Sequence, residues 1–220
     1  MNESARPDRL SIVLATHNRN KVDEYRRLLR DDFVSLVIVP YDGPEPIEDG
    51  ISFAENALTK ARAAAAHTGR IALADDSGIG VDVLCGAPGV FSARWAGSRR
   101  DSEANVALVL DQLRDIRSPH RGASFSCAIA LVVPGAERGG GGRETVVEGT
   151  WRGSVALERS GDNGFGYDPI FVPDGMRVTA AQLTADQKDA ISHRALAFEK
   201  LRVVLYPLLV GGYGAANFRR

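Results

Sequence analysis

Short apolar runs that alternate with amphipathic stretches restrict this chain to an α/β fold. Residues 10–15 form a short apolar run, which predicts a strand. Residues 18–29 follow with Val22, Tyr25 and Leu28 on one face, which predicts a helix. The chain therefore opens with a strand, a loop and a helix.

Capping signals predict a second helix. Ser52 and Glu55 have the spacing of a capping box at its start. An Ala-rich segment then extends to about Thr68, and Gly69 is placed to end it. An acidic loop at residues 40–50, punctuated by Pro and Gly, precedes this helix.

The remaining patterns predict a mixed sheet with further helices. Alternating apolar residues from Phe125 to Val133 predict a half-buried strand. We expect other strands at residues 71–74, 145–151 and 153–157, helices at residues 102–114 and 192–209, and a glycine turn at residues 139–142. This order indicates an α/β protein with an elongated mixed sheet flanked by helices, in two lobes with a central cleft. We expect one domain over residues 1–220, with residues 123–171 as a candidate second lobe.

Composition and charge exclude several classes of protein. The 220 residues are 44% hydrophobic, which is enough for one sizeable core. The 27 basic and 28 acidic residues nearly cancel, which counts against binding to nucleic acid or to anionic membranes. Cys85 and Cys127 lack a CxxC pattern, and residues 1–9 lack the pattern of a signal peptide. We therefore expect a cytoplasmic protein with reduced cysteines, no nucleic-acid partner and no membrane partner.

Two adjacent carboxylates, Asp75 and Asp76, follow the apolar run at residues 71–73. A strand end of this kind directs charge into a cleft, and we expect a turn at Ser77 and Gly78. Neighbouring carboxylates repel each other at the edge of a hydrophobic core unless a cation lies there. The pair therefore points to metal-assisted chemistry, with a solvated Asp-Asp-Ser-Gly turn as the alternative.

The turn from Thr16 to Lys21 places hydroxyl, amide and ammonium groups where the first strand meets the first helix. A helix N-terminus with such groups suits a phosphate. The turn lacks the glycines of a Walker loop and of a dinucleotide fingerprint, so it supports neither a P-loop NTPase nor a Rossmann dehydrogenase. Alternatively, Thr16 and Asn18 cap the helix while Lys21 faces solvent.

Three further segments carry candidate binding groups, each with a structural alternative. Glu55, Asn56 and Lys60 lie near one face of the second helix, where a weak surface salt bridge is the alternative. Residues 161–169 combine aromatics and carboxylates between glycines, which suits a base-stacking loop or a hairpin turn with one core aromatic. A basic cluster at residues 188–194 suits phosphates or a base carbonyl, or it is a solvated helix terminus.

Together these segments resemble the inosine triphosphate pyrophosphatase family, also called XTP/dITP diphosphatases. The resemblance spans nearly the whole chain and rests on these ordered motifs: Thr16-x-Asn18-x-x-Lys21, Phe53-x-Glu55-Asn56-Ala57-x-x-Lys60-Ala61, Ala74-Asp75-Asp76-Ser77-Gly78, Gly86-Ala87-Pro88-Gly89 with Ser92-Ala93-Arg94, Gly164-Phe165-Gly166-Tyr167-Asp168-Pro169, and Ser192-His193-Arg194. It implies hydrolysis of ITP, dITP and XTP to the monophosphate and pyrophosphate, with Mg²⁺ as cofactor, which cleanses the nucleotide pool. Because relatives are commonly homodimers, it also implies a homodimer.

The resemblance also implies roles for individual residues. Asp76 matches the proton acceptor that activates the attacking water, and Asp76, Glu48 and Asp75 match the metal site. Residues 47–50 depart from the family pattern, which has a further acid and a Thr before the glycine. The residues implied in substrate binding are the triphosphate cradle of Thr16, His17, Asn18, Arg19, Asn20, Lys21, Lys60 and Lys188, the base-stacking Phe165 and Tyr167, the purine-facing His193 and Arg194, and Ser77, Gly166 and Asp168.

Two other functions remain open at this point. A Maf-like pyrophosphatase has a related architecture and a different nucleotide preference. A non-catalytic nucleotide-binding module would use the same cradle, but we expect such a module to lack an acid near Asp76 or to lack Lys21, and this chain has both. Donors at the base site favour a 6-keto oxygen and disfavour the amine of adenine by about 1–3 kcal/mol.

Overall fold

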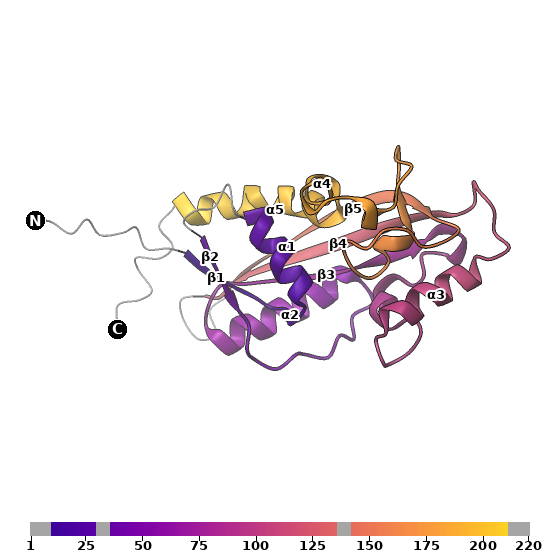
Figure 1. The fold of residues 1–220 in the computed structure, drawn as a ribbon. Coiled ribbons are helices and arrows are strands. Elements are labelled where there is room, and N and C mark those ends of the chain that lie inside the picture. The colour runs from indigo at the N-terminus through magenta and orange to yellow at the C-terminus, as the bar shows by residue number, and fades with distance from the viewer. Residues whose placement is uncertain (1–9, 30–35, 136–141, 211–220) are drawn as a thin grey trace, which may run out of the picture.

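Figure 1 shows the fold in the computed structural model, which describes residues 10–29, 36–135 and 142–210. Within these residues, six strands form one sheet in the order β2-β1-β3-β4-β5-β6. The strands are β1 (Leu10–Leu14), β2 (Leu36–Pro40), β3 (Ala72–Val81), β4 (Gly122–Val133), β5 (Arg143–Val155) and β6 (Phe171–Pro173). β1 pairs in parallel with β2 and β3, and the remaining pairs are antiparallel. The predicted mixed sheet is confirmed.

Helices cover both faces of the sheet (Figure 1). The helices are α1 (Arg19–Leu29), α2 (Phe53–Thr68), α3 (Ser102–Gln112), α4 (Ala185–Ile191) and α5 (His193–Val210), with short 3-10 helices η1 (Asp82–Leu84), η2 (Gly89–Arg94), η3 (Asp168–Ile170) and η4 (Ala180–Gln182). α2 packs on one face against β3 and β4, while α1 and α5 pack on the other face. The two long strands β4 and β5, with 12 and 13 residues, make the sheet elongated.

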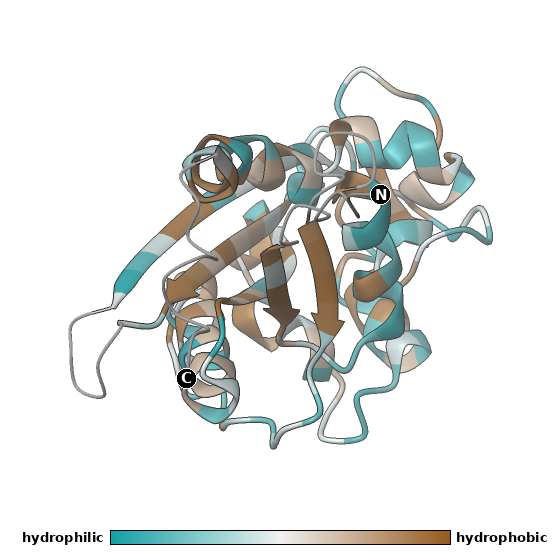
Figure 2. Ribbon diagram, turned by 90° about the vertical axis from the view of Figure 1, so that its left-hand side faces the viewer, coloured by the Kyte–Doolittle hydropathy of each residue, from teal (hydrophilic) through white to brown (hydrophobic). Residues whose placement is uncertain are grey.

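Alternate residues of the central strands enter two separate cores. Leu73 and Ile129 pack with α1 and α5, whereas Ala74 and Ala130 pack with the alanines of α2. Figure 2 shows strands of the sheet in brown, which marks hydrophobic residues. β4 is not half-buried as predicted, because residues 127–133 are buried throughout. The prediction was wrong because helices cover both faces of the sheet at this point.

A third apolar cluster lies farther along β3, β4 and β5. It joins Ile79 and Phe125 to Trp151 and to Val106 of α3. The candidate second lobe, residues 123–171, contributes β4 and β5 to the same six-stranded sheet. The sheet is therefore shared between the region near α2 and the region near α3.

β3 is longer than predicted, because its antiparallel pairing with β4 continues to Val81. The turn expected after Asp76 was therefore a wrong prediction, and Gly78 lies within the strand. A Cβ atom on Gly78 would collide with Ser92 and with the backbone of Gly89. The glycine thus allows η2 to pack closely on the strand.

Other predicted boundaries also differ from the structure. The strands expected at residues 145–151 and 153–157 form a single β5, because the register with β4 continues from Arg143 to Ser154. The last helix begins at His193, as expected to within one residue, but the sequence patterns missed α4 before it. The glycine turn expected at residues 139–142 falls mostly outside the described residues.

The caps predicted for α2 are present. Ser52 Oγ accepts a hydrogen bond from Glu55 N at 3.2 Å, and Gly69 ends the helix with a φ of 66°. A left-handed φ of this kind favours glycine. None of the described helices is both long and apolar enough to cross a membrane.

Candidate active site

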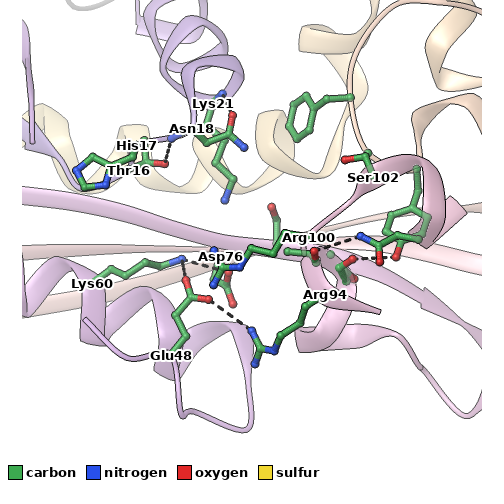
Figure 3. Close-up of a pocket in the computed structure, with 18 of the residues that line it drawn as sticks. Thr16, His17, Asn18, Lys21, Glu48, Lys60, Asp76, Arg94, Arg100 and Ser102 are labelled. Carbon is green, nitrogen blue, oxygen red and sulfur yellow. Dashed lines mark hydrogen bonds and ion pairs between the residues drawn. The ribbon is translucent and has the colours of Figure 1, made fainter. Parts of the chain in front are cut away.

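A cavity of about 640 Å³ lies beside the end of β1. β1 stops at Leu14 while β3 continues, so among the described residues β3 has only an isolated bridge from Gly80 to Pro88 on that side beyond Leu73. The predicted residues that line the cavity are Thr16, His17, Asn18, Lys21, Glu48, Lys60, Asp76, Ser77, Phe165, Gly166, Tyr167, Asp168, Lys188 and His193. Figure 3 shows how several of them converge. The cavity lining does not include the predicted Arg19, Asn20, Asp75 and Arg194.

Asp75 and Asp76 point to opposite faces of β3, as adjacent residues of a strand do. Asp75 contacts Lys21 of α1 and Arg194 of α5. Asp76 instead contacts Lys60 of α2. The two carboxylates therefore belong to different polar clusters.

Asp76 lies in the cavity beside donors from α2. Asn56 Nδ2 and Lys60 Nζ each donate a hydrogen bond of 3.2 Å to the Asp76 carboxylate. Asn56 is held in place because its Oδ1 accepts a hydrogen bond from Gly50 N at 2.9 Å. Burial raises the pKa of Asp76, and the attraction of Lys60 only partly opposes this effect. The carboxylate is thus a stronger base than an exposed aspartate.

Glu48 shares Lys60 with Asp76. Its Oε1 lies 2.9 Å from Lys60 Nζ and its Oε2 lies 3.9 Å from Arg94 Nη1 (Figure 3). Burial favours the protonated form of Glu48, but Lys60, Lys21 and Arg100 together outweigh burial and lower the pKa of Glu48. Glu48 lines the cavity, whereas Asp49 does not. The alternative of a weak surface salt bridge at Lys60 is wrong, because its side chain is only 14% exposed.

The turn between β1 and α1 has features of both predictions made for it, a helix cap and a phosphate-binding turn. Asn18 Oδ1 accepts hydrogen bonds from Asn20 N at 3.0 Å and from Lys21 N at 3.4 Å, so Asn18 caps α1. Thr16 Oγ1 accepts a hydrogen bond from Asn18 N at 3.2 Å. Lys21 does not face solvent, because its Nζ lies 3.1 Å from Asp75 Oδ2. The helix N-terminus and Lys21 together form a positively charged wall of the cavity.

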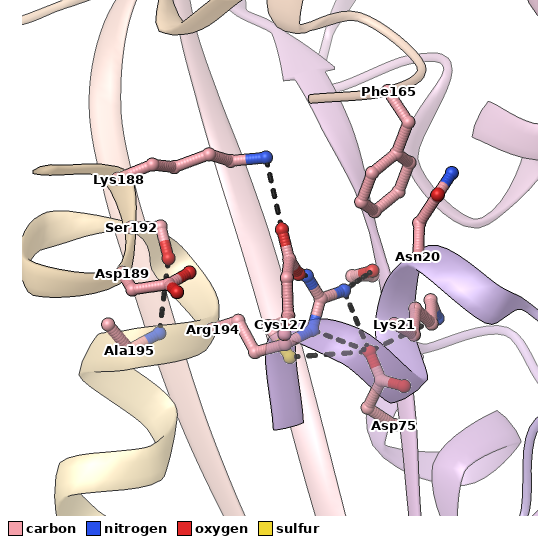
Figure 4. A network of polar contacts seen from close by, with 12 residues as sticks. Asn20, Lys21, Asp75, Cys127, Phe165, Lys188, Asp189, Ser192, Arg194 and Ala195 are labelled. Atoms are coloured by element: carbon pink, nitrogen blue, oxygen red, sulfur yellow. Dashed lines mark hydrogen bonds and ion pairs between the residues drawn. The ribbon is translucent and has the colours of Figure 1, made fainter. Parts of the chain in front are cut away.

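Asp75 lies at the centre of a buried ionic network (Figure 4). Arg194 Nη2 lies 2.9 Å from Asp75 Oδ2 and donates to Ser77 Oγ at 3.0 Å. Arg194 Nη1 also pairs with Glu24 of α1. Burial alone would raise the pKa of Asp75, but Lys21 and Arg194 outweigh burial and lower it well below its usual value. Asp75 is therefore held as a permanent anion.

This network leaves two predicted residues outside the cavity. Asp75, predicted as a metal ligand, is 1% exposed, and its Oδ2 is already bound by two cations. Arg194, predicted to face a purine, is also 1% exposed and pairs with Asp75 and Glu24, while its guanidinium carbon lies 5.9 Å from the ring centroid of Phe165. Both side chains are therefore committed to ion pairs beneath the cavity, although Asp75 Oδ1 has no hydrogen-bond partner among the described residues.

The other end of the network supports the loop before η3. Lys188 Nζ lies 2.5 Å from Asp168 Oδ2 and 3.2 Å from Glu24 Oε1. Phe165 N donates to the same Asp168 oxygen at 2.9 Å. Burial raises the pKa of Asp168, and Lys188 opposes this effect. Glu24 thus links the base of this loop to α1.

The two aromatic residues of this loop have different environments. Phe165 is half-buried, and Lys188 Nζ lies 5.0 Å from its ring centroid. Tyr167 is buried and donates through its hydroxyl to Ser92 O at 2.8 Å. Phe165 therefore presents part of its ring to the cavity, whereas Tyr167 is the core aromatic that the alternative interpretation predicted.

His193 is an uncharged group at the cavity wall. Its ring stacks on Phe125, with centroids 4.8 Å apart and an interplanar angle of 12°. Burial lowers the pKa of His193 well below its usual value, and the nearby Arg194 adds to this effect. The solvated helix terminus considered for residues 188–194 is wrong, because Lys188 and His193 are 5% and 4% exposed.

Sequence comparison identifies the family. The sequence pattern of the Ham1 family matches residues 12–204. This chain belongs to the Ham1 family. A relative named dITP/XTP pyrophosphatase from Leifsonia xyli subsp. xyli is 57% identical over 197 residues, covering 90% of this chain and 96% of the relative. A relative of the same name from Streptomyces avermitilis is 50% identical over 203 residues, with coverage of 90% and 98%.

Solved structures of Ham1 proteins share this fold. The HAM1 protein from Coxiella burnetii has a TM-score of 0.79 at 42% identity, covering 90% of this chain and 98% of that protein. The Ham1 protein from Staphylococcus aureus has a TM-score of 0.75 at 35% identity, with coverage of 89% and 98%. The family and the fold class predicted from the motifs are both confirmed.

Some residues that build the site of this Ham1 protein had no predicted role. Tyr41, Glu45, Arg94 and Arg100 line the cavity, and Glu24 supports it from below. Glu45 Oε1 lies 2.9 Å from His17 Nδ1, which ties the loop after β2 to the turn after β1. The available signals were the position of Arg94 inside a recognised motif and the three-residue spacing of Glu24 from Lys21.

Proposed function

We propose that this chain hydrolyses ITP, dITP and XTP to the monophosphate and pyrophosphate, and so keeps non-standard purines out of DNA and RNA. One observation carries the proposal. Asp76, a carboxylate with a raised pKa, lies in one cavity with cations that suit phosphates and with Phe165, which suits a base. The dITP/XTP pyrophosphatase names of the relatives agree with this reaction.

Asp76 acts as the base in the proposed reaction. A water molecule attacks the α-phosphorus and transfers its proton to Asp76. The bond between the α-phosphorus and the oxygen bridging to the β-phosphate breaks, and pyrophosphate leaves with the electron pair. Asn56 and Lys60 fix the orientation of the carboxylate through their hydrogen bonds of 3.2 Å.

The triphosphate lies along the wall formed by the N-terminus of α1, in this proposal. Backbone N–H groups at the start of a helix bind phosphate oxygens. Lys21 and Lys60 add charge on either side of β3, and their side chains are 13% and 14% exposed. This placement stabilises the negative charge that grows on the leaving pyrophosphate.

In this proposal, Glu48 and Asp76 hold a magnesium ion. Glu48 and Asp76 converge on Lys60, at 2.9 Å and 3.2 Å. Mg²⁺ is usually held by one or two carboxylates together with waters and substrate phosphates, so these two acids suffice for our proposal. When bound, Mg²⁺ polarises phosphate oxygens and neutralises charge on the leaving group. Asp75 is left out of the proposed site because it is 1% exposed and does not line the cavity.

The base site consists of Phe165, Lys188 and His193 in this proposal. Lys188, expected in the triphosphate cradle, is assigned here instead because its Nζ lies 5.0 Å from the Phe165 ring centroid. Phe165 stacks on the purine. Lys188 bonds to Asp168 and Glu24, which leaves its third N–H free for the 6-keto oxygen. Adenine presents an amine at that position, so a donor would face a donor. ITP and XTP are therefore expected to bind better than ATP.

Substrate profiling tests the proposal. Release of pyrophosphate and nucleoside monophosphate is measured with ITP, XTP, dITP, GTP, ATP and dTTP, each with Mg²⁺ and again with EDTA. We expect metal-dependent release of IMP, dIMP and XMP, with ATP and dTTP nearly inert. A preference for dTTP or UTP would favour a Maf-like enzyme, and no turnover with any nucleotide would favour a binding module.

We also propose that the chain is a cytoplasmic homodimer. Two free cysteines, Cys85 and Cys127, suit a reducing compartment. Ile51 and Phe91 are 87% and 52% exposed beside one groove, and exposed apolar groups of this kind favour a protein contact. Light scattering tests the dimer, because a monomer has a mass of 23.6 kDa and a dimer has twice that mass.

A further inference from the structure

Arg100 differs from the other cations of the cavity. The lysine and arginine side chains in the lining are Lys21, Lys60, Arg94, Arg100 and Lys188. Four of them form ion pairs with Asp75, Asp76, Glu48, Glu24 or Asp168. Among the described residues, Arg100 has no hydrogen-bonded or ion-paired side-chain partner, although it is labelled in Figure 3 beside the acids of the cavity. Its guanidinium therefore retains all of its donors.

The backbone of Arg100 has an unusual conformation. Its φ is 53°, in the left-handed region that side chains other than glycine rarely adopt. The conformation is maintained on one side by Asp101, whose Oδ1 accepts hydrogen bonds from Glu103 N and Ala104 N and caps α3. On the other side, Arg100 N donates to Gly97 O at 3.3 Å. Strained residues of this kind persist where the surroundings fix them, and they are frequent at functional sites.

Arg100 and the acid pair line the same cavity. Glu48, Asp76 and Arg100 are all part of its lining, and among the described residues no contact ion pair joins Arg100 to either acid. The guanidinium therefore faces the same space as the two carboxylates. A phosphate between Arg100 and Glu48 would accept paired hydrogen bonds from the planar guanidinium.

We propose that Arg100 binds the phosphate chain of the substrate directly, next to Asp76 and Glu48, and stabilises the negative charge that builds up as pyrophosphate leaves. This inference rests on the proposed function. It assigns the loop between η2 and α3 to the phosphate site, opposite the turn that carries Lys21. The phosphate chain is thus held from two sides.

The test compares Arg100→Gly with a neighbouring control. Glycine removes the guanidinium and also relieves the positive φ, so this variant is expected to be at least as stable as the parent. Arg99→Ala is the control, because Arg99 is exposed as Arg100 is, but does not line the cavity. We expect kcat/KM for ITP to fall by about 10- to 100-fold in Arg100→Gly, and to change by less than about twofold in Arg99→Ala.

Two further measurements separate a phosphate contact from a structural role. Arg100→Lys keeps the charge without the planar fork, so it is expected to recover only part of the activity. Added guanidinium ion is expected to raise the activity of Arg100→Gly and not that of Arg99→Ala. Melting temperatures are measured for every variant.

Binding of inorganic tripolyphosphate by calorimetry tests Arg100 independently of turnover. We expect Arg100→Gly to bind tripolyphosphate about tenfold more weakly than the parent. A parent that binds tripolyphosphate but releases nothing from any nucleotide would refute the proposed function while leaving the Arg100 comparison intact. Unchanged binding and unchanged turnover in Arg100→Gly would overturn the inference. A melting temperature that falls together with activity would also overturn it.

Discussion

Asp75 and Asp76 are neighbours on β3, yet their pKa values move in opposite directions. Asp75 is more deeply buried, but its pKa is lowered because Lys21 and Arg194 outweigh the effect of burial. The pKa of Asp76 is raised by burial, because Lys60 is shared with Glu48 and only partly opposes it. The partners of a buried acid, more than its depth, therefore decide whether it is an inert anion or a base.

This difference follows from strand geometry. Successive side chains of a strand alternate between faces, so one aspartate meets α1 and α5 while the other meets α2. The first position is closed and rich in cations. The second opens into the cavity. One acid thus supports the fold while the adjacent acid is available for chemistry.

The largest expected effect is on turnover, in Asp76→Asn. The amide keeps the shape and loses the base, so kcat for ITP is expected to fall about 10²- to 10⁴-fold with nucleotide binding retained. The free energy of unfolding at neutral pH is expected to rise or stay the same, because a buried charge with a raised pKa is removed. Steady-state kinetics and urea unfolding check both results. Turnover at the parent rate would remove Asp76 from the mechanism.

The same substitution one residue earlier is expected to act on stability. Asp75→Asn leaves Lys21 and Arg194 without their shared anion, and breaking a buried ion pair in this way costs about 3–5 kcal/mol. Urea unfolding measures this change directly. A stability equal to that of the parent would show that Glu24 alone satisfies Arg194. Asp75 would then not be needed for the stability of the fold, and this part of the contrast with Asp76 would be wrong.

The features that were predicted correctly depend on residues that lie close together in the sequence. The first strand and helix and the caps of α2 depend on residues close together in the chain, and they were predicted correctly. The family motifs then brought Asp76, Glu48 and Lys60 together as candidates, and all three meet in one cavity. The placement of Asp76 with Glu48 and Lys60 in one cavity was therefore largely predictable from the sequence.

The surroundings of Asp75 depend instead on pairing between segments that are distant in the sequence. The continuation of β3 past Asp76 is decided by its register with β4, about fifty residues later, and no local pattern reports it. The contact of Arg194 with Asp75 joins residues 119 positions apart. A pair of adjacent acids therefore predicts a charged site, but it does not predict which acid faces the cations.

The pH dependence separates the two aspartates further. In the proposed mechanism Asp76 acts as the carboxylate, so kcat/KM is expected to fall about tenfold per pH unit as the pH drops below its raised pKa. Asp75 has a lowered pKa in the folded state. Its stabilisation is therefore fully present above the unfolded-state pKa of about 3.9, and it is lost as the pH falls from there through the lower folded-state pKa. An acidic range should exist in which the protein is inactive but folded. Parallel pH profiles of activity and urea unfolding check this, and a simultaneous loss of both would contradict it.

The smallest effect is expected at a third aspartate, Asp82, which directly follows β3. Its Oδ2 lies 3.0 Å from Arg152 Nη2, and the two side chains are 51% and 57% exposed. Water screens an exposed pair of this kind, so Asp82→Asn is expected to cost only about 0.2–1 kcal/mol and to leave ITP turnover unchanged. Urea unfolding and kinetics under the conditions used for Asp75→Asn provide the comparison. If Asp82→Asn cost as much as Asp75→Asn, burial of the cations around Asp75 could not be the reason for its importance, because the exposed pair would then be equally strong.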